Sequence, residues 1–111
     1  MYNQETQQIA ADVYHNYLDQ AHVIIEDFNS SAHHDSINKM NILWGQLHMA
    51  GGARYMYGDE HMDEYSYQWL GKKGRKIIDE LMKDAKKSNM KVALKNLKEL
   101  RDILEEKNLI N

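Results

Sequence analysis

The chain has 111 residues, 28% of them charged, and it contains neither cysteine nor proline. The lack of cysteine excludes disulfides, thiolate metal sites and a cysteine nucleophile, and it fits a reducing compartment. The first residues lack the pattern of a signal peptide, and no apolar run approaches the ~20 residues that span a membrane. We therefore expect one helical domain, residues 1–111, that is cytoplasmic, does not contact a membrane and carries no cofactor.

Charge is divided unevenly along the chain. Residues 1–70 contain ten acidic and two basic side chains, whereas residues 71–111 contain seven acidic and twelve basic ones. The formal charges of the two parts are therefore −8 and +5, which sum to the net charge of −3. A field polarised in this way steers partners without specifying a fold.

The first half of the chain predicts two helices. The first runs from Gln4 to Phe28, with Asn3 as N-cap, because apolar residues recur at steps of three and four. The second is capped by Asp35 or Ser36. Its apolar positions are Ile37, Met40, Trp44, Leu47 and Gly51. The pair Gly51-Gly52 either ends this helix or marks a close crossing with a neighbour.

The second half predicts two more helices. The third follows a cap at Asp59, and glycines near Gly71 indicate a kink or a break. Its expected core positions are Tyr67, Leu70, Gly74, Ile77, Leu81 and Ala85. The fourth starts after Ser88-Asn89, with Met90, Ala93, Leu97, Leu100 and Leu104 on one face. No internal repeat is visible, and the pattern predicts an all-α, compact antiparallel bundle of four helices, or five if the third breaks.

An aromatic cluster surrounds the expected turn before the third helix. It consists of Tyr55, Tyr57, Tyr65, Tyr67 and Trp69. A bundle of this size cannot easily bury all of these rings, and tyrosine and tryptophan are enriched at interfaces. We expect an exposed patch that serves a partner protein or a homodimer; the alternative is an ordinary core with scattered surface tyrosines.

A basic cluster follows these aromatic residues directly. Its members are Lys72, Lys73, Arg75 and Lys76. Basic side chains next to aromatic rings can bind phosphates and stack on bases, so the Lys72–Lys76 segment is a candidate for nucleic-acid contact. Docking onto an acidic protein surface and simple solvation are the alternatives.

Arg54 and His61 form a further candidate pair. Their spacing resembles the arginine–histidine pair of the HEPN-type helical ribonucleases. The resemblance implies that Arg54 would hold phosphate and His61 would assist proton transfer. It departs from the family pattern at Tyr55, where a polar residue is common.

A polar stripe on the predicted first helix offers metal-ligand chemistry. With Asp12, it comprises His15, Asp19, His22 and Glu26 at steps of three and four. Imidazoles and carboxylates bind iron, manganese or zinc in helical bundles, but one helix supplies only about two ligands at good geometry. A metal-binding bundle is thus an alternative to a solvated face.

Taken together, these features favour a small non-enzymatic interaction protein that regulates, inhibits or adapts a larger protein. Its size and acidic, cysteine-free composition are common among bacterial and phage accessory proteins, which is an analogy of composition. The alternatives are nucleic-acid binding through Lys72–Lys76, with or without ribonuclease chemistry, and metal binding.

Overall fold

Helices form all the regular structure in residues 3–53 and 60–111, which the computed structural model describes, with side chains from residue 64 in the second range. The elements are α1 (Gln4–Asn16), α2 (Leu18–Ser30), α3 (His34–Ala50), α4 (Glu60–Trp69), the π-helical turn η2 (Leu70–Gly74), α5 (Arg75–Lys87) and α6 (Lys91–Glu106). The predicted all-α class is therefore confirmed.

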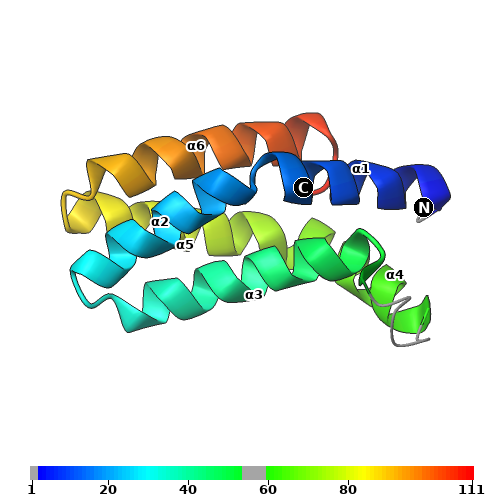
Figure 1. Cartoon of the computed structure of the whole chain (residues 1–111), viewed down its shortest axis with the longest axis horizontal. Coiled ribbons are helices and arrows are strands. Elements are labelled where there is room, and N and C mark those ends of the chain that lie inside the picture. The colour runs from blue at the N-terminus through cyan, green and yellow to red at the C-terminus, as the bar shows by residue number, and fades with distance from the viewer. Residues whose placement is uncertain (1–2, 54–59) are drawn as a thin grey trace.

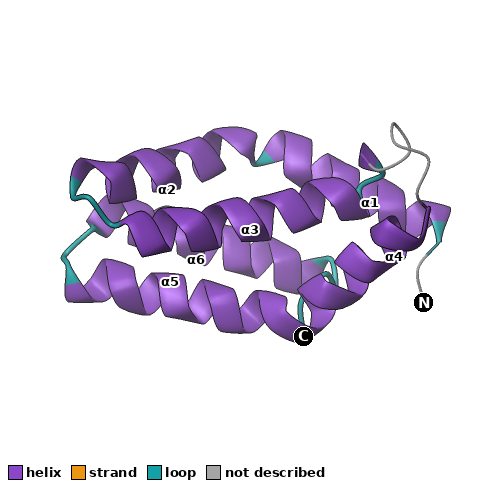
Figure 2. Cartoon of the chain, turned by 90° about the horizontal axis from the view of Figure 1, so that it is seen from below, coloured by secondary structure: helices purple, strands orange, loops and turns teal. Residues whose placement is uncertain are grey.

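Four of these helices form an antiparallel bundle. Helices α2, α3, α5 and α6 lie side by side, while α1 continues the line of α2 and α4 leads into α5 (Figure 1). The short α2–α3 and α5–α6 connections lie at the same end of the bundle, as the view from below also shows (Figure 2). Apolar side chains from α1, α2, α3, η2, α5 and α6 form one central core, and the partly buried Tyr67 and Trp69 of α4 pack against it.

The predicted first helix is divided at Tyr17. Its start is confirmed, because the Asn3 side chain accepts a hydrogen bond from the Thr6 N–H at 2.9 Å. At Tyr17 the backbone leaves helical geometry, with φ −113° and ψ 17°. The Tyr17 N–H still donates to the carbonyl of Val13, so the apolar stripe continues across the break.

The predicted cap of α3 was wrong. The helix begins at His34, and His33 occupies the N-cap position in place of Asp35 or Ser36. Both alternatives expected at Gly51 are found. Helix α3 ends at Ala50, and α1 crosses so closely that a Cβ on Gly51 would lie 2.8 Å from the Cα atom of Ala11.

The kink expected near Gly71 is the π-helical turn η2. A π turn adds about one residue to the local repeat, so buried positions then recur every four residues. The buried positions are Ser66, Leu70, Gly74 and Ile78. Ile78 therefore takes the core position that we expected for Ile77, which is half-buried, and Ser66 takes the position expected for Tyr67.

The apolar face predicted for α6 is confirmed, since all five expected residues are buried. The chain then turns back at Asn108, whose φ of 60° is left-handed, and the Leu109 N–H donates to the Leu104 carbonyl at 2.9 Å. This turn buries Leu109 and Ile110, which the sequence pattern did not predict. Ile110 lies over Gly74, where a Cβ would come within 2.7 Å of it.

The bundle consists of two hairpins with the same backbone plan, α2–α3 and α5–α6. Their N-caps are 57 residues apart (74 − 17 and 90 − 33), and both first helices have 13 residues. Both connections use a left-handed residue, at Ala32 and Asn89, and both close with the same type of C-terminal hydrogen bond. Residues 17–50 and 74–107 are nevertheless identical at only four aligned pairs, 27/84, 31/88, 43/100 and 47/104.

One of these identical pairs, Asp27 and Asp84, joins the two hairpins, because each aspartate accepts a hydrogen bond from the other hairpin. Asp27 on α2 accepts a hydrogen bond from the Ala93 N–H at 2.8 Å, in the first turn of α6. Asp84 on α5 accepts one from the Ser36 hydroxyl at 3.0 Å, in the first turn of α3. Because the side chain of the N-cap residue Met90 makes no capping hydrogen bond, Asp27 supplies the missing cap to α6 from the other hairpin.

Removing the Asp27 carboxylate should destabilise the fold. Asp27→Ala is expected to lower the free energy of unfolding by about 1–2 kcal/mol, because the Ala93 amide loses its acceptor. Asp27→Asn keeps an acceptor oxygen and should recover part of the loss. Urea unfolding would measure both, with exposed Asp19→Ala on the same helix as control; equal stabilities for all three variants would contradict the capping role.

Two glycines of the α3 segment should respond oppositely to alanine. A Cβ on Gly45 meets nothing within 4 Å, so Gly45→Ala should stabilise the protein by about 0.5–1 kcal/mol through helix propensity. Gly51→Ala should destabilise it by about 1–3 kcal/mol, because the new Cβ overlaps the backbone of α1. Thermal unfolding of the two variants would test this; a shift of the same sign in both would refute the close approach.

Candidate protein-interaction surface

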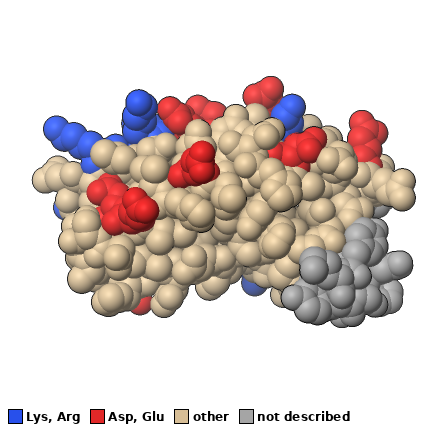
Figure 3. Space-filling view, viewed as in Figure 1, with Lys and Arg blue, Asp and Glu red and all other residues tan. Residues whose placement is uncertain are grey.

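An uncharged surface lies on the outside of α3 and along the adjoining edge of α2, and it is bordered by the exposed acids Asp19, Glu26 and Asp35. The outer face of α3 presents Asn38, Asn41, Ile42, Gly45, His48 and Met49, which are exposed or half-buried. With histidine neutral, none of them carries a formal charge. In the space-filling view the area over α3 is largely free of charged side chains (Figure 3).

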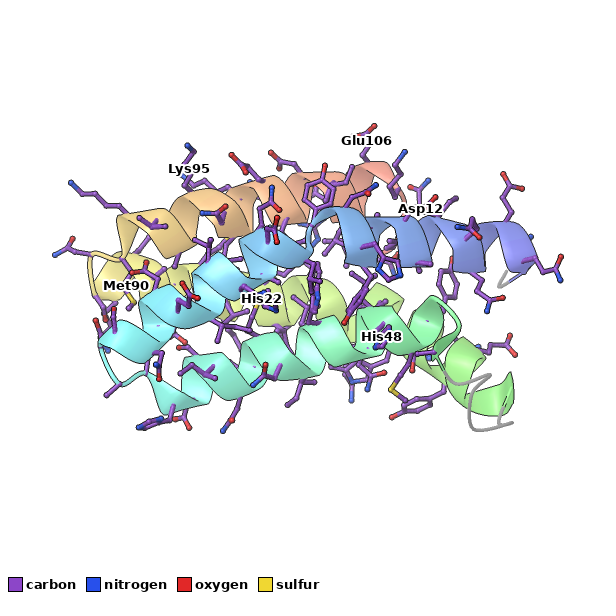
Figure 4. All side chains as sticks on the ribbon, viewed as in Figure 1. Asp12, His22, His48, Met90, Lys95 and Glu106 are labelled. Carbon is purple, nitrogen blue, oxygen red and sulfur yellow. The ribbon has the colours of Figure 1, made fainter. Side chains whose placement is uncertain are left out.

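The neighbouring edge of α2 extends this surface. Asp27 points toward α6, so the opposite edge of α2 borders α3. That edge carries Leu18, His22, Ile25 and Asn29. Figure 4 shows His22 and His48 on the same side of the molecule, one from each helix. We call these ten residues of α2 and α3 the α2–α3 surface.

The second hairpin provides a matched comparison. Adding 57 to each position of the α2–α3 surface gives Arg75, Asp79, Met82, Lys86, Lys95, Lys98, Glu99, Asp102, Glu105 and Glu106. Nine of these ten side chains are charged. The two sets occupy corresponding places on the same backbone plan, so solvent exposure alone does not account for the missing charge on α2–α3.

An aromatic stack closes the end of this surface next to α1. The Tyr14 ring stacks on His48, with centroids 4.2 Å apart and planes at 11°, and on Trp44 at 5.3 Å. Partial burial lowers the pKa of His48, and the nearby His15 lowers it further. Partial burial and the neighbouring His15 therefore both favour the neutral form of His48.

The predicted aromatic patch is divided by the structure. Tyr65 is exposed, at 55%, whereas Tyr67 and Trp69 are half-buried and pack against the core. Tyr55 and Tyr57 lie outside the described residues. The three described rings therefore do not form a single exposed patch.

The basic cluster is also divided. Lys72, Lys73 and Lys76 are exposed, and they line or adjoin a groove of about 530 Å³ on η2 and α5. Arg75 is instead bound to the end of the chain: its Nη1 lies 2.9 Å from the Glu105 carboxylate, and its Nε donates to the carbonyl of Asn111. The same groove contains Asp79 and Glu80, which weaken its attraction for an anionic ligand.

The metal candidates on the first helix are all exposed, and the break at Tyr17 lies within their stripe. Among the residues with described side chains, no three or more histidine, aspartate or glutamate side chains come together to hold a metal ion. Thus His15, Asp19, His22 and Glu26 do not form a site with one another. Arg54 and the side chain of His61 fall outside the described part of the chain, so the proposed ribonuclease pair stays a prediction.

Our sequence reading missed the α2–α3 surface, although a signal for it exists. Residues 40–53 contain no charged side chain. In a chain that is 28% charged, fourteen residues would contain about four (0.28 × 14). The apolar stripe of α3 predicts only the buried face of the helix. The uncharged run contains residues of the outer face as well.

In comparisons with known proteins, no family model matches the chain, and neither a curated protein nor a solved structure matches it. In the described part of the chain, none of the helices has the length and apolarity needed to cross a bilayer.

The His48 stack should make stability depend on pH. Because the pKa of His48 is lowered on folding, the unfolded chain binds a proton there at a higher pH than the folded chain does. Stability should therefore fall as the pH drops below about 6.5, the usual value for histidine. Thermal unfolding at pH 7.5 and 5.5 would measure this loss.

His48→Gln should reduce the loss, whereas His34→Gln, at the exposed start of the same helix, should retain it. An unchanged pH dependence in His48→Gln would show that the stack does not disfavour the charged imidazole.

Proposed function

We propose that this protein is a small, non-enzymatic protein-interaction module that binds through its α2–α3 surface. The observation that supports this is the contrast between the two hairpins: ten neighbouring positions on α2–α3 are uncharged, and nine of the ten corresponding positions on α5–α6 are charged. Charged residues are depleted at the centre of protein interfaces, because burying an unpaired charge is costly. Such a module would regulate, inhibit or adapt its partner.

The composition of the surface fits a reversible contact. Ile42 is 49% exposed and supplies apolar area, and Met49 adds a side chain that adapts to different partners. Asn38 and Asn41 can both donate and accept hydrogen bonds. The acidic surroundings contributed by residues 1–70 would influence the rate at which partners approach, while the uncharged centre would be buried.

Nucleic-acid binding through the exposed Lys72, Lys73 and Lys76 is the second candidate. The groove beside these lysines supports nucleic-acid binding, whereas Asp79 and Glu80 in the same groove would repel phosphates. This candidate does not require anything to cover the α2–α3 surface.

Site-specific photo-crosslinking in cells would test the proposal without assuming an occupant. Gly45 would be replaced by the photoreactive residue p-benzoyl-phenylalanine, because a side chain there meets open space. Asp102, the corresponding position on α6, would carry the same residue as matched control. We expect protein adducts from position 45 and not from position 102, and the adduct mass would identify the occupant.

Adducts in equal yield from both positions, or from neither, would refute an interaction surface on α2–α3. Thermal unfolding of both labelled proteins would confirm that each is folded before the comparison is made.

A further inference from the structure

We infer that the occupant of the α2–α3 surface is a second copy of this chain, with the two α3 helices facing one another across a two-fold axis. The inference rests on the proposed function, since it names the partner of the same surface. The surface differs from the basic and aromatic residues that the sequence first suggested as a docking region.

The first argument is electrostatic. Helices α1 to α3 contain six acidic side chains and one basic one, Lys39, which already pairs with Asp84 and Glu80 at 3.5 and 3.8 Å. Two copies that met through charged parts of this half would therefore place like charges together. The α2–α3 surface is the extended area of this half where contact between copies brings no such repulsion.

The symmetry of a dimer strengthens this argument. In a two-fold interface, residues near the axis meet their own copies, so a charge there meets the same charge. A partner of opposite charge would instead favour a surface of one sign. With no charge at the ten positions, two copies can meet there without placing like charges at the axis and without burying an unpaired charge.

The remaining side chains are self-complementary. The Asn38 and Asn41 amides each offer donors and acceptors, so they can pair with the same groups of a second copy. Ile42 stands at the midpoint of α3, since (34 + 50)/2 = 42, and it would meet the second Ile42 near the axis. Gly45, one turn further on, adds no charge to this surface and has open space beyond it.

The size of the surface sets the expected strength. A helix of 17 residues is about 25 Å long, and two neighbouring helices present a strip about 20 Å wide. The footprint is then about 500 Å² per copy, or about 1,000 Å² in total, which is near the lower limit for a specific interface. We therefore expect a reversible dimer with a Kd on the order of micromolar.

Sedimentation equilibrium of the purified protein, from about 1 µM to about 1 mM, would test the inference. The wild-type mass should rise from 13.1 kDa toward 26.2 kDa (2 × 13.1) with concentration. Ile42→Lys and Ile42→Glu should each weaken self-association at least tenfold, because each places like charges at the axis. Glu99→Lys, at the corresponding position on α6, should self-associate like the wild type.

Mixing the two Ile42 variants gives the sharpest outcome. Lysine on one copy and glutamate on the other should restore association in the mixture, which happens only if position 42 meets itself. Gly45→Asp provides an independent disruption and should also be monomeric. Circular dichroism would confirm that the exposed substitutions leave the helices intact.

The results separate the inference from the proposed function. A wild-type protein that stays at 13.1 kDa throughout, or Ile42 variants that dimerise normally, would overturn the inference. If crosslinking from position 45 then captured a different protein, the interaction function would stand with another occupant. If crosslinking also gave no adduct, both would fail.

Discussion

The bundle depends on two carboxylates that cross between its hairpins. Asp27 of α2 caps α6, and Asp84 of α5 binds Ser36 at the start of α3. Each hydrogen bond lies beside a short connection whose left-handed residue ends the preceding helix. The two aspartates therefore couple the start of one hairpin's second helix to the first helix of the other, beside the apolar core that the four long helices share.

Local spacing was sufficient to predict most of the helices. In α6, apolar residues at steps of three and four lie on one face, and all five are buried as expected. The division of the first helix at Tyr17 was not predicted, because the apolar stripe passes through the break. After Gly71 the expected core positions Gly74, Leu81 and Ala85 are buried, but Ile78 replaces Ile77, because spacing rules assume a uniform repeat and the π turn changes it locally.

Long-range features were beyond such rules. Asp27 and Ala93 are 66 residues apart, so no local pattern shows that one caps the other. Leu109 and Ile110 follow the last helix and are buried only because Asn108 turns the chain back over Gly74. The α2–α3 surface was missed for a different reason: it is defined by missing charges, and the uncharged run 40–53 also contains the buried stripe of α3, which accounts for part of the run.

The two hairpins separate the requirements of folding from those of binding. Both bury similar apolar positions and close with the same type of turn, yet nine of the ten positions on α5–α6 that correspond to the uncharged α2–α3 surface are charged. The shared features belong to the architecture. The surface charges differ between the hairpins, so the fold does not dictate them. The uncharged α2–α3 surface is therefore more informative about function than the shared core and turns.

The two hydrogen bonds between the hairpins also determine what would happen if the chain were cut into two fragments. Asp27 of the first hairpin accepts from the Ala93 N–H of the second, and Asp84 of the second accepts from the Ser36 hydroxyl of the first. A cut between α3 and α4 would leave the Ala93 N–H of one fragment and the Ser36 hydroxyl of the other without their acceptors, and both fragments would expose an apolar face. The fragments would complete one another on mixing, in the manner of a split protein, and neither would be a smaller version of the whole.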